Sequence, residues 1–495
     1  MKLKVKDMDI ATGGILVCIM NRHDAHRMDL HALDRILVRS GRRSTTAIVD
    51  IAESEKAVPR GKIGMFEEVL KKLGAKHNTI VDITFAQKPK SVSFIRRKLM
   101  NEELVRDELD TLVQDIVSDS LSESELTYFV AAAQTNGLSH EETVDLTQSI
   151  VRHGDRLRLK KKLIMDKHCT GGVPGNRTTM VLVPILVAAG LTVPKTSSRA
   201  ITSPAGTADT MEVLAPVTLP INKMKSVVDR VGGCIVWGGA VSLASADDKL
   251  IKVRNTMGLD PEPLLLASIL AKKAAVNATH VLIDIPFGPD NKVASRDEAA
   301  RLEHAFITIG ARLGMKIHVV MSEGTEPIGN GIGPALEARD VLWVLENNKK
   351  APMDLRQKSL DMAGALLSIA GKKEGRKLAE KLLNSGKALE AMKKIIRAQG
   401  GNSFITGDKV KIGKCTTVIT AHKNGYVVDM NMKVIARLCR IAGAPIDKGA
   451  GMLLHVHQGT QVNKGDPLFT LYAENSEKLK FAVDAYRQFD GFMIR

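Results

Sequence analysis

The chain has 495 residues, of which 44% are hydrophobic, 25% charged and only 3% aromatic. This is an ordinary globular composition with an aliphatic core, and the length suggests about three domains. The net charge of +16 raises the possibility of nucleic-acid binding. The basic residues are, however, interleaved with apolar and acidic ones and lack an aromatic-rich recognition motif, which favours small anionic substrates over nucleic acid.

Targeting and redox signals point to the interior of the cell. The five cysteines are widely spaced without a CxxC pair, which fits a reducing compartment and does not fit a zinc site. The N-terminus lacks an apolar signal core, and the most apolar run, 181–191, is too short to span a bilayer. His455 and His457 alternate without a third ligand of suitable spacing. We therefore expect a cytoplasmic protein with no metal and no membrane contact.

Residues 1–86 are expected to form a β-rich module of their own. Short alternating or apolar segments there are separated by Gly and Asp, as in small β-domains. Residues 61–75 carry apolar side chains at helical spacing, followed by a Gly stop, and predict one helix. Residues 86–91 are a plausible linker. We expect this module to contribute to the assembly of a larger oligomer.

The next region is predicted to be helical. Ser122 with Glu125, and Ser139 with Glu142, have the spacing of capping boxes at the starts of two amphipathic helices. Short turns join these helices into a compact bundle. The apolar face of the bundle offers a surface for a homodimer or a larger homo-oligomer.

From residue 163 onward, short apolar runs alternate with Gly-rich loops and helical stretches. This alternation predicts a mainly parallel sheet with helices on its faces, in which ligands bind beyond the carboxyl ends of the strands. The last ninety residues lose the helical period, and 418–431 and 453–474 are typical of β-hairpins. Their pattern is similar to barrel-sandwich modules related to lipoyl and biotinyl carriers. A structural barrel is favoured over a carrier role for Lys433, because an α/β body precedes it.

The predicted fold class is therefore multidomain α/β. The domains are 1–86, a β-rich module; 87–162, a helical domain with a later segment near 250–275; 163–403, a central α/β domain that carries the two loops described next; and 404–495, a barrel-sandwich-like β-domain.

The first loop whose residues could bind a ligand is "DKHCTGGVPGNRTTMVLV", residues 166–183. Glycines there let the backbone approach an anion, and the N-terminus of the following helix offers unpaired N–H groups. Lys167 adds a charge, and Thr170 and Thr178 add hydroxyl donors. The glycine spacing matches neither a Walker A loop nor a dinucleotide-binding fingerprint. The alternative is a tight turn that needs glycine for its geometry alone.

The second loop is "SSRAITSPAGTADTME", residues 197–212. It follows the next predicted strand, so that both loops should aim at one crevice. Its hydroxyls can donate to ligand oxygens, and Arg199 can pair with a phosphate in bidentate fashion. The alternative is a cluster of cap residues for the helix that follows.

Together, the two loops resemble the signature of the thymidine phosphorylase family of nucleoside phosphorylases. The resemblance covers about residues 88–495 and continues through 253–275, 281–293 and 309–345. Length near 500 and the additional N-terminal module resemble the archaeal branch. Its members cleave a nucleoside 5′-monophosphate with inorganic phosphate to the free base and ribose 1,5-bisphosphate. The resemblance implies no cofactor, since phosphate is a co-substrate.

The resemblance also implies roles for individual residues. Inorganic phosphate would be held by Lys167, Thr178, Ser197 and Thr207. Cys169 stands where the thymidine enzymes usually have Ser, and because a thiol is a weak donor it is omitted. The implied nucleotide contacts are Gly172, Ser198, Arg199, Ala200, Ile201, Thr202, Ser203, Thr207, Ser268 and Lys292.

Base recognition is where this sequence departs from the thymidine enzymes. Ser268 and Lys272 keep the family spacing, but Arg254 lies one residue closer to Ser268 than the family's Arg does. "SPAGT", 203–207, replaces a His-Thr-Gly-Gly-Thr run. Both differences put thymidine in doubt and favour another base with an added 5′-phosphate. His168 either faces the base or makes a structural hydrogen bond.

The implied reaction is displacement at the anomeric carbon by phosphate, which needs no protein nucleophile. Arg199 is the natural partner of the 5′-phosphate. Asp260 matches the family's proposed proton donor and must carry its proton when it acts. Glu262 is the alternative protonated carboxyl group, and Asp260 could instead cap the helix that follows. A pyrimidine nucleoside phosphorylase and a nucleotide-binding regulator without turnover remain the competing interpretations.

Overall fold

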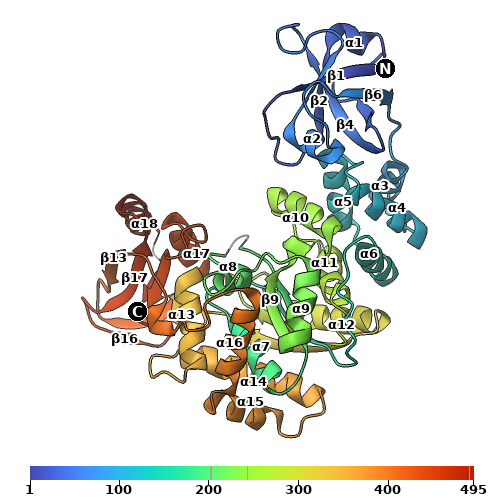
Figure 1. The fold of residues 1–495 in the computed structure, drawn as a ribbon. Helices are drawn as coiled ribbons and strands as arrows, with labels where there is room; N and C mark the ends of the chain where they lie inside the picture. Colours follow the sequence, from blue (N-terminus) through green and yellow to red (C-terminus); the bar gives the residue numbers. More distant parts are fainter. Residues whose placement is uncertain (201–202, 242, 490) are drawn as a thin grey trace. The chain divides into compact units, whose positions relative to one another are not determined.

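The computed structural model describes residues 1–200, 203–241, 243–489 and 491–495. The chain forms two compact units (Figure 1). The first contains 1–149 with 246–264, and the second contains 150–245 with 265–495. Each unit is described by itself below.

The first unit begins with a closed six-stranded barrel in the order β1-β5-β2-β4-β3-β6. Its strands are β1 (Lys2–Asp7), β2 (Val17–Asn21), β3 (Arg35–Ser40), β4 (Arg43–Ala52), β5 (Lys62–Met65) and β6 (Ile80–Phe85). Two short helices, α1 (Arg22–His26) and α2 (Glu67–Leu73), accompany it. Buried aliphatic side chains from every strand fill the interior.

The prediction of one helix over 61–75 was wrong in its first half. Lys62–Met65 is strand β5, which pairs in parallel with β1 and antiparallel with β2. Closing the barrel needs a strand between those two, so the pairing overrides the local helical spacing. Only Glu67–Leu73 is helical, and it ends at Gly74 in a left-handed conformation with φ 61°.

Helices make up the rest of the first unit. They are α3 (Ser91–Leu99), α4 (Arg106–Val117), α5 (Glu123–Thr135), most of α6 (His140–Arg152) and most of α10 (Ser245–Met257). The two predicted capping boxes are confirmed. The Ser122 and Ser139 hydroxyls accept from the backbone N–H groups of Glu125 and Glu142, and the two carboxylates accept from the serine N–H groups at 2.8 Å. Glu142 also forms a buried ion pair with Lys98 at 2.9 Å.

A parallel sheet lies at the centre of the second unit, as the alternating sequence pattern predicts. β7 (Met165–Cys169), β10 (His280–Phe287) and β11 (Lys316–Glu323) pair in parallel, and so do β8 (Val193–Ser197) and β9 (Gly233–Trp237). A parallel bridge between Ile164 and Thr192 connects the two groups. The strand order is therefore β11-β10-β7-β8-β9, with the carboxyl ends of all five strands at one edge.

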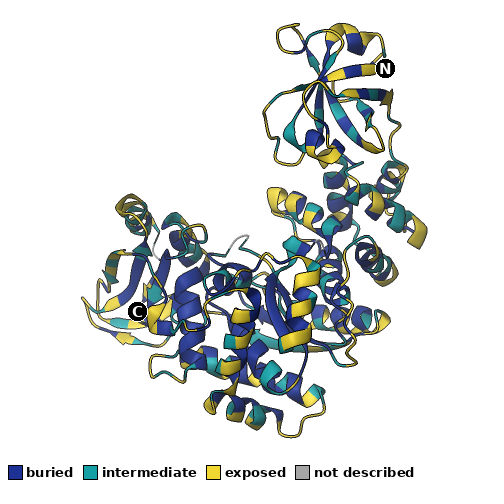
Figure 2. Ribbon diagram, in the orientation of Figure 1, coloured by how far each residue is buried: buried dark blue, intermediate teal, exposed yellow. Residues whose placement is uncertain are grey.

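Helices surround this sheet (Figure 1). They are α7 (Thr178–Ala188), α8 (Thr207–Glu212), α9 (Ile221–Val231), α11 (Glu262–Ala275), α12 (Arg296–Arg312), α13 (Pro334–Leu345), α14 (Met353–Ile369), α15 (Gly375–Asn384) and α16 (Lys387–Gln399). Every residue of α13 is buried, and α7 is buried over its first nine residues (Figure 2). The core between these helices and the sheet is almost wholly aliphatic.

The C-terminal part of the second unit combines two small sheets with two helices. One sheet has the order β12-β15-β17-β13 and the other β16-β14-β18. The elements are β12 (Gly331–Ile332), β13 (Cys415–Thr420), β14 (Gly425–Met430), α17 (Met432–Ile441), β15 (Gly451–Leu454), β16 (Gln461–Val462), β17 (Pro467–Ala473), α18 (Ser476–Gln488) and β18 (Phe492–Ile494).

The predicted hairpin over 418–431 was wrong, because β13 pairs with β17 and β14 pairs with β16 and β18. Helix α17 was not predicted, although its signals are in the sequence. The Asn431 side chain caps it by accepting from the Val434 N–H, and its apolar face buries Met432 and Ile435. Lys433 lies on this helix, is mostly exposed and pairs with Asp290 at 3.2 Å.

Within the described ranges, no helix is both long enough and apolar enough to cross a membrane.

Candidate active site

Lys167 is a buried cation in the middle of β7, two residues before the carboxyl end of that strand. Its ammonium group donates to the Thr178 hydroxyl at 3.0 Å and to the Asp284 carboxylate at 2.9 Å, and its side chain is 1% exposed. Burial would raise the pKa of Asp284, but the ammonium groups of Lys167 and Lys358 hold that pKa below its usual value. The arrangement brings together two residues predicted for inorganic phosphate and adds an anchoring carboxylate from β10.

Glycines shape the loop between β7 and α7. Gly172 has φ 106°, and a Cβ there would lie 2.8 Å from the Asn291 side-chain oxygen. Gly175 has φ 72°, and a Cβ there would lie 2.5 Å from the Ile328 carbonyl oxygen. Both positions therefore require glycine for conformation and for close packing. Lys292 lies beside the same loop, with its side chain 3.9 Å from the position of a Cβ on Gly171.

Three hydroxyl groups near the ends of β7 and β8 are buried and have no hydrogen-bond partner among the residues that the structure describes. They belong to Thr170, Thr196 and Ser197. Buried polar groups are nearly always hydrogen-bonded, so unpartnered ones need an explanation. A ligand with several acceptor oxygens, such as phosphate, is the kind of group that would satisfy them. Ser197 was predicted for this role and Thr170 was named as a hydroxyl donor of the first loop, although it was left out of the phosphate set that the family resemblance implies, whereas Thr196 was not selected.

Arg177 joins the first loop to the second. Its guanidinium donates to the Thr207 hydroxyl at 2.9 Å and to the Ala205 carbonyl at 3.0 Å. It also pairs with the buried Glu337 at 2.5 Å. Burial raises the pKa of Glu337, and the positive charge of Arg177 opposes that rise. The two predicted loops therefore converge, through an arginine that the sequence analysis did not select.

Arg199 is engaged by acidic residues of α8. Its guanidinium donates to Glu212 at 2.6 and 2.8 Å and to Asp209 at 3.1 Å, and it lies over the Trp237 ring at 4.9 Å. Lys448 reaches the same two carboxylates. Hydrogen bonding to Arg199 lowers the pKa of Glu212 to about 2. To bind a 5′-phosphate, Arg199 would have to exchange carboxylate contacts for phosphate contacts.

Hydrogen bonds within the second loop and to the Asp209 side chain fix the remainder of this loop. The other Asp209 oxygen accepts from the N–H groups of Ala200 and Gly206 at 2.6 and 2.9 Å. The Ser203 hydroxyl donates to the Ala205 carbonyl at 3.0 Å. Ser198 follows β8 directly. The predicted contacts Ile201 and Thr202 lie outside the described residues.

The residues predicted to surround the base belong to two different units of the chain. In the second unit, Ser268 and Lys272 lie one turn apart on α11, with the ammonium 3.2 Å from the hydroxyl. Desolvation and then the charges of Lys273 and Lys195 lower the pKa of His168, so its ring is neutral. In the first unit, Arg254 on α10 pairs with Asp260 at 3.1 Å. Arg254 is 7% exposed at its side chain and Asp260 36%.

Cys169 lies next to the phosphate residues but is a poor donor. Its sulfur accepts from the Asn176 amide at 3.6 Å. Burial and the Asp284 charge raise its pKa, so the thiol stays protonated. In the part of the chain that the structure describes, no group of three or more His, Cys, Asp or Glu side chains is arranged to hold a metal ion.

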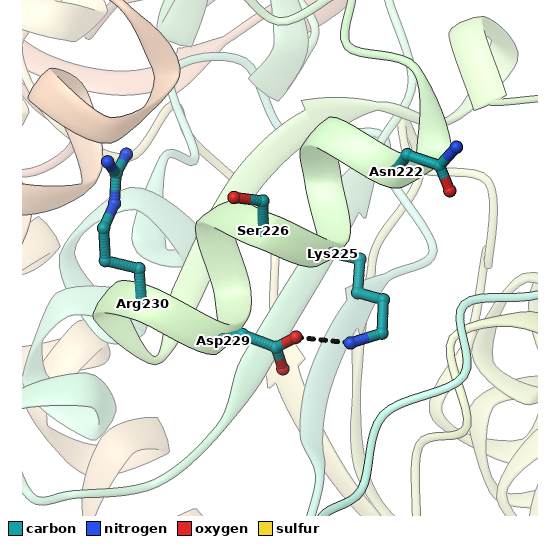
Figure 3. A pocket seen from close by; sticks show the side chains of 5 residues that line it. All are labelled: Asn222, Lys225, Ser226, Asp229 and Arg230. Carbon is teal, nitrogen blue, oxygen red and sulfur yellow. Dashed lines mark hydrogen bonds and ion pairs between the residues drawn. The ribbon is translucent and has the colours of Figure 1, made fainter.

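A shallow hollow of about 490 Å³ lies along α9. All five side chains that line it come from that one helix, and Lys225 and Asp229 pair across it (Figure 3). It contains none of the residues predicted for the substrate. The site is therefore defined by the two loops at the strand ends and not by this surface.

Comparison with known families first defines the class of protein. Residues 92–154 match the helical bundle domain of the glycosyl transferase family, and residues 161–389 match the a/b domain of that family. Residues 426–489 match the pyrimidine nucleoside phosphorylase C-terminal domain. Anthranilate phosphoribosyltransferase from Thermus thermophilus has the same fold over 62% of this chain and 98% of its own, with a TM-score of 0.53 and 20% identity.

Relatives over the full length narrow this class. AMP phosphorylase of Methanococcoides burtonii is 43% identical over 497 residues, covering 100% of this chain and 97% of the relative. AMP phosphorylase of Pyrococcus furiosus is also 43% identical, covering 100% and 98%. A putative thymidine phosphorylase of Legionella pneumophila is 41% identical, covering 99% and 95%. The chain belongs to the AMP phosphorylase family.

Proposed function

We propose that the chain catalyses the phosphorolysis of AMP to adenine and ribose 1,5-bisphosphate, and that CMP and UMP are further substrates. The observation that carries the proposal is the cluster of polar side chains on β7, α7 and β8, which is suited to an anion. Lys167 and Thr178 are fixed there next to buried hydroxyls without protein partners. The full-length relatedness to AMP phosphorylases supports the same activity.

Inorganic phosphate is the nucleophile in this mechanism. Lys167, Thr178, Ser197 and Thr207 hold it so that one oxygen faces the anomeric carbon. The new C1′–O bond forms as the bond from C1′ to the base nitrogen breaks, and the base takes a proton as it leaves. Correct positioning of the two reactants contributes on the order of 7–11 kcal/mol to lowering the barrier.

Asp260 is proposed to supply that proton as the general acid. Asp260→Asn is expected to lower kcat by roughly 10²–10⁴-fold with little change in the KM for phosphate, because the amide cannot donate a proton in the same way. Single-turnover measurement of adenine release tests this role, with Asp229→Asn on the exposed face of α9 as the matched control. Wild-type turnover by Asp260→Asn would assign the proton donor elsewhere.

Nucleotide recognition is proposed for the second loop together with Gly172, Ser268 and Lys292. We propose that the neutral His168 ring lies beside the base and can form a hydrogen bond to it. We further propose that the enzyme works in the cytoplasm as a homodimer or larger assembly, with residues 1–86 contributing to its size. Comparing the mass in solution of the full chain with that of a chain lacking 1–86 tests this last point.

One assay distinguishes the competing functions. The full chain is incubated with AMP, CMP, UMP, adenosine or thymidine, each with and without inorganic phosphate, and free base is quantified. Base release that needs both phosphate and a 5′-monophosphate supports the proposal. Release from thymidine would indicate the activity suggested by the name of the Legionella relative. Nucleotide binding without base release would identify a regulator.

A further inference from the structure

A second group of buried ionisable side chains lies on the opposite face of β7 from Lys167, since successive strand residues point to opposite faces. Asp166, Lys195 and Lys273 are each at most 4% exposed. The Lys273 ammonium lies 2.7 Å from one Asp166 oxygen, while the Lys195 ammonium lies 3.9 Å from the other. Lys195 also donates to the Thr196 carbonyl of its own strand. One carboxylate therefore serves two ammonium groups.

The neighbouring group has the same imbalance. Asp284 accepts from Lys167 at 2.9 Å, and its other oxygen lies 3.5 Å from the Lys358 ammonium. Across the two groups, four lysines face two aspartates, an excess of two positive charges if every group is ionised. An uncompensated charge is costly to bury, so a lysine gives up its proton or an anion balances the charge.

Lys195 is the lysine whose surroundings make proton loss easiest. It is the lysine farthest from its carboxylate. Desolvation, followed by repulsion from Lys273, lowers the pKa of Lys195 to about 7, against the attraction of Asp166. Lys167 repels it as well, and the nearby His168 ring is neutral.

The strand that carries Lys195 ends in hydroxyl groups suited to an anion. Thr196 and Ser197 follow directly, and both side-chain oxygens are buried with no hydrogen-bond partner in the described part of the chain. Ser197 is two residues along the strand from Lys195 and so shares its face of the sheet. The Ser197 hydroxyl and an adaptable positive charge thus lie on one face of β8 near its carboxyl end, whereas the Thr196 hydroxyl is on the other face of the same strand end.

We propose that Lys195 is a charge-adapting positioning residue, which takes up one proton when a phosphate-group dianion binds at the end of β8. The anion then meets a lysine that is charged in the complex and largely neutral in the free protein above neutral pH. The inference rests on the proposed function only in that the site receives phosphate groups. Inorganic phosphate and the 5′-phosphate of AMP are the two sources of that group.

Because binding is coupled to one proton, affinity depends on pH in a defined direction. Above the pKa that Lys195 has in the free protein, binding of each dianion requires Lys195 to take up a proton from solvent. The Kd for the dianion should therefore rise roughly tenfold per pH unit. Below that pKa, Lys195 already carries its proton and the coupling disappears. The test is therefore made at about pH 8, where both ligands are dianions.

The experiment is isothermal titration calorimetry on the full chain with inorganic phosphate alone and with AMP alone, each in two buffers of different ionisation enthalpy. The wild-type chain is expected to take up about one proton with one of the ligands. Uptake with phosphate alone places the coupled site at the attacking phosphate, and uptake with AMP alone places it at the 5′-phosphate. Absence of uptake with both would overturn the proposal.

Two substitutions separate charge from structure. Lys195→Met is expected to abolish the uptake and to weaken binding of the same ligand, with a Kd that no longer changes between about pH 7.5 and 9. Lys195→Arg keeps a permanent charge and should bind tightly without uptake. Unchanged uptake in either variant would contradict the role of Lys195, and the Arg variant together with the wild-type pH profile decides the matter if the Met variant does not fold.

Lys225→Met on α9 is the surface control and should keep the wild-type uptake. Base release from AMP is measured on the same samples, so that the two proposals can fail separately. Turnover without proton uptake would overturn only the role of Lys195. Proton uptake without turnover would overturn only the proposed reaction.

Discussion

The two loops at the carboxyl edge of the sheet hold their cations in different ways. Lys167 in the first loop is buried and has one carboxylate and one hydroxyl as partners. Arg199 in the second loop is about one third exposed at its side chain, and two carboxylates and an aromatic ring surround it. Lys448 competes for the same carboxylates. Lys167 lies beside unpartnered hydroxyls, whereas Arg199 is built into the frame of its loop.

The difference teaches that two cations with similar sequence signals need not share a role. A buried ammonium with a single carboxylate leaves room in its coordination for a ligand oxygen. A guanidinium that two carboxylates already bind gains less from a phosphate, because those bonds must first be broken. We therefore expect substitution of Lys167 to affect chemistry, and substitution of Arg199 to affect the shape of the second loop.

The largest expected effect on activity comes from Lys167→Met. Removing the ammonium takes away the charge that holds the attacking phosphate, so kcat/KM for phosphate should fall on the order of 10²–10³-fold. Binding of AMP alone should change much less. Initial rates over a range of phosphate concentrations, together with calorimetric AMP binding, test this split against Lys225→Met as control. Equal losses for both ligands would show that Lys167 is a general structural element.

Arg177→Met should have the largest effect on stability. It leaves Glu337 buried without its cation, and breaking a buried pair from one side typically costs about 3–5 kcal/mol. It also frees Thr207 and Ala205 from the first loop, so activity should fall as well. Urea unfolding followed by circular dichroism measures the loss, with the exposed Arg487→Met as control. A loss below about 1 kcal/mol would mean that the two loops are not coupled through Arg177.

Arg199→Met gives a smaller and more discriminating effect. If Arg199 frames the loop, KM should rise by a similar factor, on the order of tenfold, for AMP and for any activity on adenosine. Removing one hydrogen-bonded charged partner typically costs about 1.5–3 kcal/mol, which sets that scale. If Arg199 binds the 5′-phosphate, only AMP loses. The ratio of kcat/KM for AMP to that for adenosine decides between these roles, and a selective loss for AMP would reverse our comparison.

The sequence predicted the fold wherever local signals agree with long-range pairing. The capping boxes at Ser122 and Ser139 were sufficient for α5 and α6, and the alternation from residue 163 onward was sufficient for the parallel sheet. Strand β5 was not predicted, because it forms only through pairing with β1 and β2 when the barrel closes. A short stretch of sequence carries no information about that pairing. Helix α17 escaped because the Gly-rich β pattern on either side of it hid a clear Asn cap and an apolar face.

The sequence identified the two loops of the candidate site, but it identified less well the residues that pair with the charged side chains of these loops. Lys167 was selected from its motif, but its carboxylate partner lies 117 residues further along the chain. A signal for that partner does exist, because Asp284 interrupts the apolar run that follows His280 in β10. Arg177 and Lys195 lie within or beside the two motifs and were passed over, since a motif alone does not tell which of its charges are buried.

The smallest expected effect concerns His457, which connects the C-terminal part of the second unit to the loop after β11. Its ring bonds Glu326 and Asn330, both at 3.0 Å, and the Gln458 N–H donates to the same Glu326 oxygen at 3.0 Å. Hydrogen bonding to Glu326 raises the pKa of His457, with smaller contributions from Asp354 and Asp340. The same loop contacts the glycine loop, since the Ile328 N–H donates to the Pro174 carbonyl.

The sign of the pH effect follows from the direction of that shift. A histidine whose folded pKa lies above its unfolded value stabilises the folded state fully below the unfolded pKa, and this contribution disappears as pH rises through the folded pKa. His457→Gln keeps a hydrogen-bonding side chain without the charge. The difference in unfolding free energy between wild type and His457→Gln should therefore be largest near pH 6 and shrink towards about pH 9, in paired urea titrations. Because the side chains of His457 and Glu326 are both about one third exposed, solvent screening keeps the effect small. A difference in unfolding free energy that grows with pH would show that the charge on His457 is not the source of this contact's stability.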